Sequence, residues 1–286
     1  NYNVVVGDEA GTAITTGDQN TALGNNALQA VNTGSNNTGI GAAAGDALTV
    51  GTLNTALGVA SLTADTTGSK STAIGTFTLN AQNFTTATDT HNTAVGYSAG
   101  VSVTTGIQNT LIGSLAGDAL TGNGFSGATR TAGADYNTAV GMLALSSDTK
   151  GNRSVAVGYG ALEVQNFTTT TDTYNVAVGF NAGQQTTTGA FNTLIGGQAG
   201  DAITDGYDNV AVGKGALSLE DRGAKNTAIG HEALLNQNAG TGVTYNTAVG
   251  ASAGASVSTG IQNTLIGALA GDALATNGGD NVALGF

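Results

Sequence analysis

Apolar residues recur in short clusters along the whole 286-residue chain, with polar segments between them. Each cluster follows the motif Asn-Thr-Ala-Val-Gly, as in residues 92–96. The closing glycine marks sixteen copies, at positions 7, 24, 41, 58, 75, 96, 113, 141, 158, 179, 196, 213, 230, 250, 267 and 285. The interval between successive glycines is 17 in ten of the fifteen cases, and 18, 20, 21, 21 and 28 in the others. The chain is therefore an array of 17-residue units with occasional insertions.

Each motif predicts a short β-strand. The second position is always Thr or Val and the fourth is always Val, Ile or Leu, so branched side chains stand at alternate positions, a pattern typical of strands. The third position is mostly Ala, so both faces of the strand carry small or apolar side chains. A strand of this kind is expected to be covered on both sides. We therefore expect the fourth position, for example Val95, to be internal.

Seventeen residues are too few for a strand-helix-strand unit, but they suit one coil of a parallel β-solenoid. Equivalent residues of stacked coils lie about 4.8 Å apart, so each column of residues has one environment. Sixteen coils predict a rod roughly 75 Å long. Glycine in a column indicates a positive φ or a close backbone approach. Asparagine in a column predicts a ladder of side-chain amides at a buried bend, formed by Asn20, Asn37, Asn54, Asn92, Asn109, Asn137, Asn175, Asn192, Asn209, Asn226, Asn246 and Asn263.

A second period groups the coils in fours. The residue four places after the motif glycine is always Leu or Gly, and in coils 4 to 15 it runs Leu-Leu-Gly-Gly three times. Insertions keep this phase, because the second coil of each group carries one, starting at Gln82, Gln165 and Gln237. The sequence therefore indicates one solenoid domain over residues 1–286 that contains three four-coil cassettes, at 54–136, 137–208 and 209–280.

Composition narrows the class of protein. The chain has 46 Gly, no Pro, Cys or Trp, only 9% charged residues and a net charge of −12. Without cysteine there is neither a disulfide framework nor a thiolate site. The acidic charge disfavours nucleic acid and anionic membranes as partners, and no apolar stretch approaches the roughly 18 residues of a membrane span. Absence of proline fits a chain whose amides are used in bonds between coils.

The apolar content of one coil is small. One Val or Ile, one Thr or Val, two Ala and half a Leu per coil stabilise the fold by about 5–7 kcal/mol, whereas fixing 17 residues costs roughly 17–34 kcal/mol of backbone entropy. Hydrogen bonds and dispersion supply part of the difference. The remainder argues for additional buried surface between chains, and we expect a homotrimer about the rod axis; the composition by itself indicates only that the chain is not a monomer.

The repeated Asn-Thr-Ala-Val/Ile/Leu-Gly motif, followed by x-x-Ala-Gly or x-x-Ala-Leu, resembles two groups of proteins. It is similar to the repeat regions of tail-fibre proteins from marine, cyanophage-like bacteriophages, and to the head repeats of trimeric autotransporter adhesins. The resemblance covers the whole chain. It implies a β-roll, left-handed in the adhesins, and a homotrimeric fibre. The 17-residue unit is longer than the usual repeat of the adhesin heads, so the cross-section of the coil is expected to differ.

Few residues carry candidate chemistry. Asp46, Asp118, Asp201 and Asp272 recur in Ala-Gly-Asp-Ala; we interpret them as turn residues that bond to their own backbone, with a calcium column as the alternative. We expect no cofactor and no catalytic residues. Aromatic and charged residues in the loops are candidates for contact with a surface glycan, and the alternative is that they cap the solenoid edge or pack between chains. These are Phe84, His91, Phe125, Arg130, Tyr136, Phe167, Tyr174 and Tyr245.

These observations predict a non-enzymatic structural module: the shaft or receptor-contacting part of a phage tail fibre, located on the virion. Its expected partners are further copies of itself, adjoining fibre domains at both ends, and a glycan or protein receptor on the host surface. The alternative is a bacterial cell-surface adhesin or an extracellular filament subunit of the same architecture. A third hypothesis, a solenoid polysaccharide depolymerase, needs a pair of spaced carboxylates, and adjacent acids such as Glu220 and Asp221 say little about such a spacing.

Overall fold

The computed structural model describes residues 2–122, 125–126, 129–130, 133–240, 242–274 and 278–285, with 125–126 and 129–130 described by their backbone alone. This part of the chain is all-β, with strands joined by turns and without helices. It divides into two compact units, Asn1–Asn152 with Thr168–Thr171, and Arg153–Phe167 with Asp172–Phe286. Each unit contains eight coils of a parallel β-solenoid, which confirms the predicted fold class.

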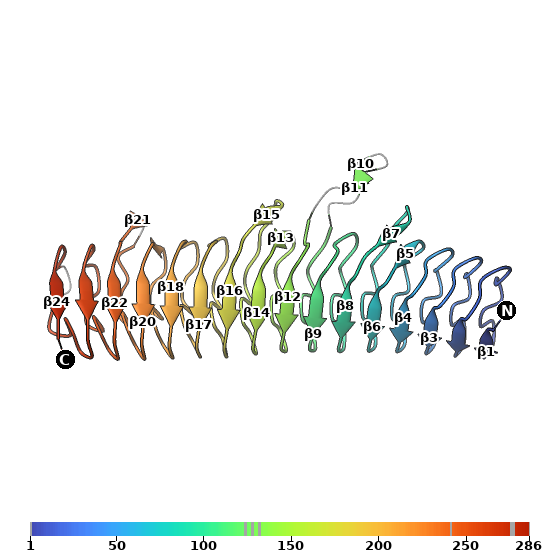
Figure 1. Cartoon of the computed structure of the whole chain (residues 1–286), viewed down its shortest axis with the longest axis horizontal. Coiled ribbons are helices and arrows are strands. Elements are labelled where there is room, and N and C mark those ends of the chain that lie inside the picture. The colour runs from blue at the N-terminus through green and yellow to red at the C-terminus, as the bar shows by residue number, and fades with distance from the viewer. Residues whose placement is uncertain are drawn as a thin grey trace. The chain divides into compact units, whose positions relative to one another are not determined.

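The strands of the first unit form one parallel sheet in which each motif pairs with the next. The register is direct, so that Thr93 lies opposite Thr110 and Val95 opposite Ile112. Figure 1 shows these strands side by side. They are β1 (Val4–Val6), β2 (Thr21–Leu23), β3 (Thr38–Ile40), β4 (Thr55–Leu57), β6 (Thr72–Ile74), β8 (Thr93–Val95), β9 (Thr110–Ile112) and β12 (Thr138–Val140).

The second unit repeats this arrangement. Val176 lies opposite Thr193, and Val178 opposite Ile195. Its strands are β14 (Val155–Val157), β16 (Val176–Val178), β17 (Thr193–Ile195), β18 (Val210–Val212), β20 (Thr227–Ile229), β22 (Thr247–Val249), β23 (Thr264–Ile266) and β24 (Val282–Leu284).

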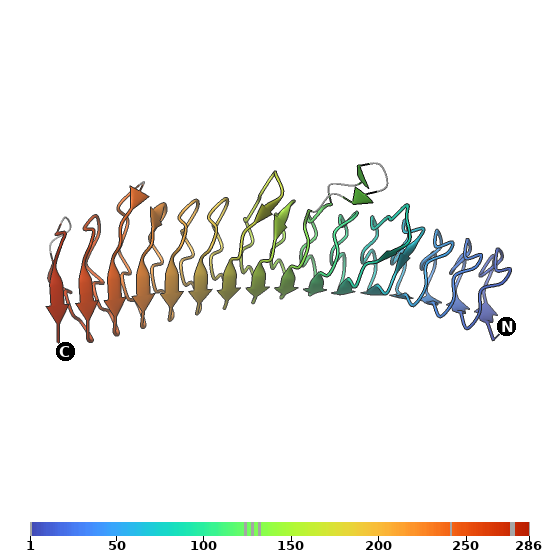
Figure 2. The same cartoon turned by 45° about the horizontal axis from the view of Figure 1, so that its top comes forward.

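Short additional strands lie away from the main sheets, in the insertions and in the loops of the coils before them, as Figure 2 shows for β7 and β5 of the first unit. β5 (Gly68–Ser69) pairs in parallel with β7 (Thr88–Asp89), and β19 (Gly223–Ala224) with β21 (Gly242–Val243). β10 (Phe125–Ser126) and β11 (Thr129–Arg130) form an antiparallel pair. The remaining short strands are β13 (Gly151–Asn152) and β15 (Thr171–Asp172).

The core of each coil is narrow and lined by the third motif position. Ala94 and Leu111 are fully buried there, whereas the second and fourth positions on either side of them are partly exposed. The alanine three residues after the motif glycine is buried as well, for example Ala99. The motif glycine itself is required by its neighbour: Gly96 has φ +139°, and a Cβ on it would lie 2.5 Å from the carbonyl oxygen of Gly113.

The column of Leu and Gly residues four places after the motif glycine exchanges core volume with the third motif position of the strands. The column has φ between about +47° and +72° throughout the described coils, a conformation in which glycine is easiest to accommodate. Leu79 nevertheless fills this position in the coil before Ala94. Where the strand carries Leu111 instead of Ala, both adjacent column residues are glycine, and a Cβ on Gly100 or Gly117 would lie 2.6 and 2.8 Å from the Leu111 methyl groups. The same exchange occurs at Leu194 with Gly183 and Gly200, and at Leu265 with Gly254 and Gly271.

The prediction that the fourth motif position is internal is wrong for the single chain. Val95 is half-buried, and Leu23, Ile112 and Ile266 are 39–47% exposed. The side chains of a strand alternate between its two faces, and the third position is the one that points into the coil. The second and fourth positions therefore share the outer face of the sheet.

Candidate functional site

The recurrent asparagine of each motif bridges coils mainly through backbone groups. The Asn109 amide N–H donates to Oδ1 of Asn92 at 3.0 Å, while Nδ2 of Asn109 donates to the carbonyl oxygen of Ala134 at 2.8 Å. Direct contact between neighbouring amide side chains is the lesser component, at 3.4 Å between Asn109 and Asn92 and 3.1 Å between Asn263 and Asn246. This column satisfies the polar groups of the bend that precedes each strand, which is a structural role.

The other asparagines of the predicted ladder hold equivalent buried places. Their Nδ2 groups donate to a carbonyl oxygen 14 or 15 residues further along the chain in Asn20, Asn37, Asn54, Asn92, Asn137, Asn175, Asn192, Asn209, Asn246 and Asn263. Asn226 differs, because its Nδ2 is buried without a hydrogen-bond partner. Its Oδ1 still accepts from the backbone N–H of Asn246 and from the Thr244 hydroxyl.

A buried carboxylate and a buried glutamine face each other in the first unit. Asp65 is fully buried, and its Oδ2 accepts from Nε2 of Gln82 at 2.6 Å, while its Oδ1 accepts from the backbone N–H groups of Gly68 and Phe84. Gln82 also donates to the Ser71 hydroxyl and accepts from Asn92. Burial raises the pKa of Asp65 from its ordinary value.

The second unit carries a related network in which glutamate takes the place of aspartate. Glu220 is fully buried; its Oε1 accepts from the backbone N–H of Gly223 at 2.7 Å, and its Oε2 is buried without a partner. Burial raises the pKa of Glu220. The polar groups stand three residues after the column Leu, where the other coils carry Val, Leu, Ile or, in one coil, Thr186. Their burial was not predicted from the sequence, although Asp65 and Gln82 keep the phase of the four-coil period.

The outer face of each main sheet is uncharged at its centre. In every coil the second and fourth motif positions lie on this face as Thr or Val beside Val, Ile or Leu, and none of them is fully buried. Two further residues flank them in each coil: the residue before the asparagine and the residue after the glycine. In one coil, His91 and Tyr97 flank Thr93 and Val95. The result is a stripe of threonine and aliphatic side chains with a more polar and aromatic column on each side.

The predicted surface-contact residues divide into two groups. His91, Tyr136, Tyr174 and Tyr245 occupy one column, directly before the motif asparagine, and all four are exposed. In contrast, Phe84 is fully buried and Phe167 is 7% exposed, so their assignment to a contact surface is wrong. Each of these phenylalanines lies two residues after a buried glutamine and closes the edge of its coil. The side chains of Phe125 and Arg130 lie outside the described residues.

Aromatic side chains gather on the outer face of the second unit. Tyr174 and Phe191 stack with their ring centroids 5.9 Å apart and their planes 19° apart, and Tyr159 and Phe180 stack at 5.5 Å and 13°. The two pairs stand on opposite flanks of the sheet, because Tyr174 precedes β16 and Phe180 follows it. Arg153 lies over the Tyr174 ring at 5.6 Å.

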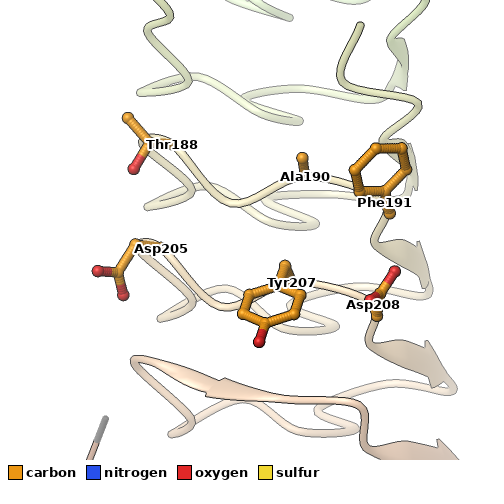
Figure 3. Close-up of a pocket in the computed structure, with 6 residues that line it drawn as sticks. All are labelled: Thr188, Ala190, Phe191, Asp205, Tyr207 and Asp208. Atoms are coloured by element: carbon orange, nitrogen blue, oxygen red, sulfur yellow. The ribbon is translucent and has the colours of Figure 1, made fainter. Parts of the chain in front are cut away.

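Next to Phe191 lies a surface pocket of about 520 Å³. Figure 3 shows its lining on the two neighbouring segments that lead into β17 and β18: Asp205 stands at one end, Phe191 and Asp208 at the other, and the Tyr207 ring between them. Thr188 and Ala190 complete the lining. This pocket was not predicted from the sequence, because Phe191, Tyr207 and the two aspartates are distributed over two coils.

The recurrent aspartates lie far from one another in the coil order. Asp46, Asp118, Asp201 and Asp272 each occur four coils apart, and their immediate neighbours in the column are other residue types. Burial raises the pKa of Asp46, Asp118 and Asp201, and one carboxylate oxygen of each is buried without a hydrogen-bond partner. Among the described residues no group of three or more His, Cys, Asp or Glu side chains is placed to hold a metal ion. Calcium at these aspartates stays an untested alternative.

No helix in the described part of the chain is both long enough and apolar enough to cross a membrane. Comparison of the chain with protein-family models gives no match, and comparison with curated proteins gives none either. What the protein does is therefore inferred from its fold and its surface.

Proposed function

We propose that the chain is a non-enzymatic structural module of a phage tail fibre, which assembles as a homotrimer and contacts the host surface. The observation that carries this proposal is the uncharged outer face of the main sheets. Solvent-exposed sheet faces usually carry polar residues, whereas here a branched aliphatic side chain recurs in every coil and is 38–73% exposed in eight of them. Extended apolar patches of this kind mark interaction surfaces.

The free energy available from this face is of the same order as the cost of assembly. Burying the exposed half of one aliphatic side chain contributes about 1 kcal/mol per coil, so eight coils of one unit contribute roughly 8 kcal/mol for each chain. This is within the range of about 4–15 kcal/mol that association costs in lost freedom of motion. Identical chains have matching columns, since the repeat places threonine or valine at the second motif position of every coil. Side-by-side packing of copies therefore covers the face without burying a charge.

Charged substitutions on the face test this assembly. The double variant Val178→Lys, Ile195→Lys places two ammonium groups on the outer face of β16 and β17, and we expect it to sediment as a single chain because burying them is costly. The matched control is Gln185→Lys, which adds a charge to an exposed loop position of the same region. A double variant that is folded by circular dichroism and assembles like the control would refute this use of the face.

Location tests the biological assignment. Antibodies against the chain should label the fibres of virions in electron micrographs. Label that is restricted to the bacterial envelope would overturn the phage assignment in favour of a cell-surface adhesin or filament.

A further inference from the structure

The pocket beside Phe191 has the chemistry of a site for sugar rings. Its lining includes the aromatic side chains of Phe191 and Tyr207, which are 52% and 40% exposed. Exposed aromatic rings offer flat apolar faces. The Tyr174 ring extends this surface by one coil, because it stacks on Phe191. Three aromatic side chains thus follow one another over three successive coils.

The charged groups of the pocket are acceptors. Asp205 and Asp208 supply carboxylates at the two ends of the lining, and Thr188 adds a hydroxyl. An ionised carboxylate can only accept hydrogen bonds, so the pocket suits a ligand with many donors. The neighbouring cation is Arg222, whose Nε lies 3.8 Å from Asp205 and 3.6 Å from Asp221 and is therefore shared between two acids. Among the described residues no ion pair involves Asp208.

The charge of the pocket selects among glycans. Its lining contains two acids and no basic side chain, and the chain as a whole carries a net charge of −12. Carboxylate or sulfate groups of an acidic polysaccharide in the pocket would be repelled by these two carboxylates. Hydroxyl groups and protonated amines would be accepted. A small number of placed polar groups beside aromatic walls is typical of ligand sites.

We propose that this pocket binds a neutral or amine-bearing glycan of the host surface. Phe191 and Tyr207 stack on the apolar faces of its pyranose rings, and Asp205 and Asp208 accept hydrogen bonds from its hydroxyl or ammonium groups. This inference rests on the proposed function as a host-contacting module and names the ligand class and the place of contact. It also places the ligand at one point of the array, because the equivalents of Phe191 in the cassettes on either side are Gln108 and Gln262.

Those equivalents provide a matched variant. Gln108 and Gln262 have φ +58° and +59°, close to the +62° of Phe191, so Phe191→Gln removes the ring without a new demand on the backbone. The second variant is Asp208→Asn, which keeps the shape of the side chain and removes its charge. The control is Tyr97→Ala, which deletes an exposed ring of the first unit.

The experiment measures binding of the immobilised full chain to cellohexaose, mannohexaose and a chitosan hexamer, with an alginate hexamer as the anionic counterpart. We expect at least one of the first three to bind, the alginate hexamer to bind at least tenfold more weakly, and Phe191→Gln to weaken binding at least tenfold. Asp208→Asn should weaken the chitosan hexamer most, whereas Tyr97→Ala should change nothing.

Two results would overturn the inference: none of the three oligosaccharides binds, or binding is equal in the wild type and Phe191→Gln. Light scattering on the same samples separates this inference from the proposed function. A trimer that binds no sugar removes only the glycan site, and a monomer that binds sugar in the Phe191 pocket removes only the assembly.

Discussion

The exchange of volume between the strand and the Leu/Gly column can be tested by moving one leucine side chain to the other position. Leu111 is fully buried between Gly100 and Gly117. Leu111→Ala leaves a cavity whose two adjacent column residues have no side chain to fill it. Substitutions of this type cost about 2–5 kcal/mol, and the cost is highest where the site cannot collapse. We therefore expect a loss of about 3–5 kcal/mol, in the upper part of that range.

The reverse change, Gly100→Leu, overfills the same space. A Cβ at Gly100 lies 2.6 Å from Cδ1 of Leu111 and 3.0 Å from Cδ2 of Leu79, and overpacking costs about 1–3 kcal/mol. A non-glycine residue in the left-handed region adds about 1–2 kcal/mol, and Gly100 has φ +60°. The double variant Gly100→Leu, Leu111→Ala reproduces the pair formed by Leu79 and Ala94. The two losses should therefore compensate by about 2 kcal/mol, within the range of coupling energies between residues in contact.

The assay is native-state hydrogen exchange of the amides in residues 93–117. Local opening is measured there because long repeat arrays depart from two-state unfolding, which makes one global free energy ill-defined. We expect each single variant to lower the protection of this segment, and the double variant to recover a large part of it. Losses that add to within about 0.5 kcal/mol, as those of independent sites do, would refute the volume exchange.

Three other predictions follow from burial. Ala94→Asp should abolish the folded coil, because Ala94 is fully buried and an unpaired buried charge is destabilising by several kcal/mol. Val95→Asp on the outer face should keep the β-rich circular dichroism spectrum, and an equal loss of this spectrum in both variants would contradict the assigned faces. Asn109→Ala should destabilise its coil by about 1–3 kcal/mol in hydrogen exchange, because the Asn137 amide N–H loses its acceptor, and an unchanged exchange rate would show that this bond is dispensable. Burial raises the pKa of Glu220 above its ordinary 4.5, so the folded chain holds this proton more tightly than the unfolded chain; stability is gained as pH falls from the raised pKa towards 4.5 and lost as pH rises. Glu220→Gln should therefore be more resistant to urea than the wild type at about pH 8 and equal to it near pH 4, and an equal difference at both pH values would speak against a titrating Glu220.

The coil length and the position of the strands could be predicted from the sequence because stacking imposes the same constraint sixteen times. Which strand face points inward could not. At positions 93–95 both faces carry small or apolar side chains, and this pattern is symmetric with respect to inside and outside. The decision depends on space: a coil with a narrow core accepts Ala94 and leaves Val95 outside.

The candidate site was less predictable for a different reason. Tyr174 and Tyr245 were predicted because they are aromatic residues in the loops, and the structure places them in an exposed column beside the repeated motif. Phe84 also stands between an asparagine and a threonine. It is nevertheless buried, because the insertion folds it over the edge of the coil, and this arrangement depends on contacts between residues that are far apart in sequence. The pocket at Phe191 joins side chains from two coils, and only the stacking of those coils brings them together.

The mass of the assembled protein in solution tests the central claim, that the outer face of the sheets is covered by further copies of the chain. Multi-angle light scattering over a range of protein concentrations measures it directly. We expect a mass three times the 27.7 kDa of one chain, as in a homotrimer. A constant mass of 27.7 kDa at all concentrations would contradict it.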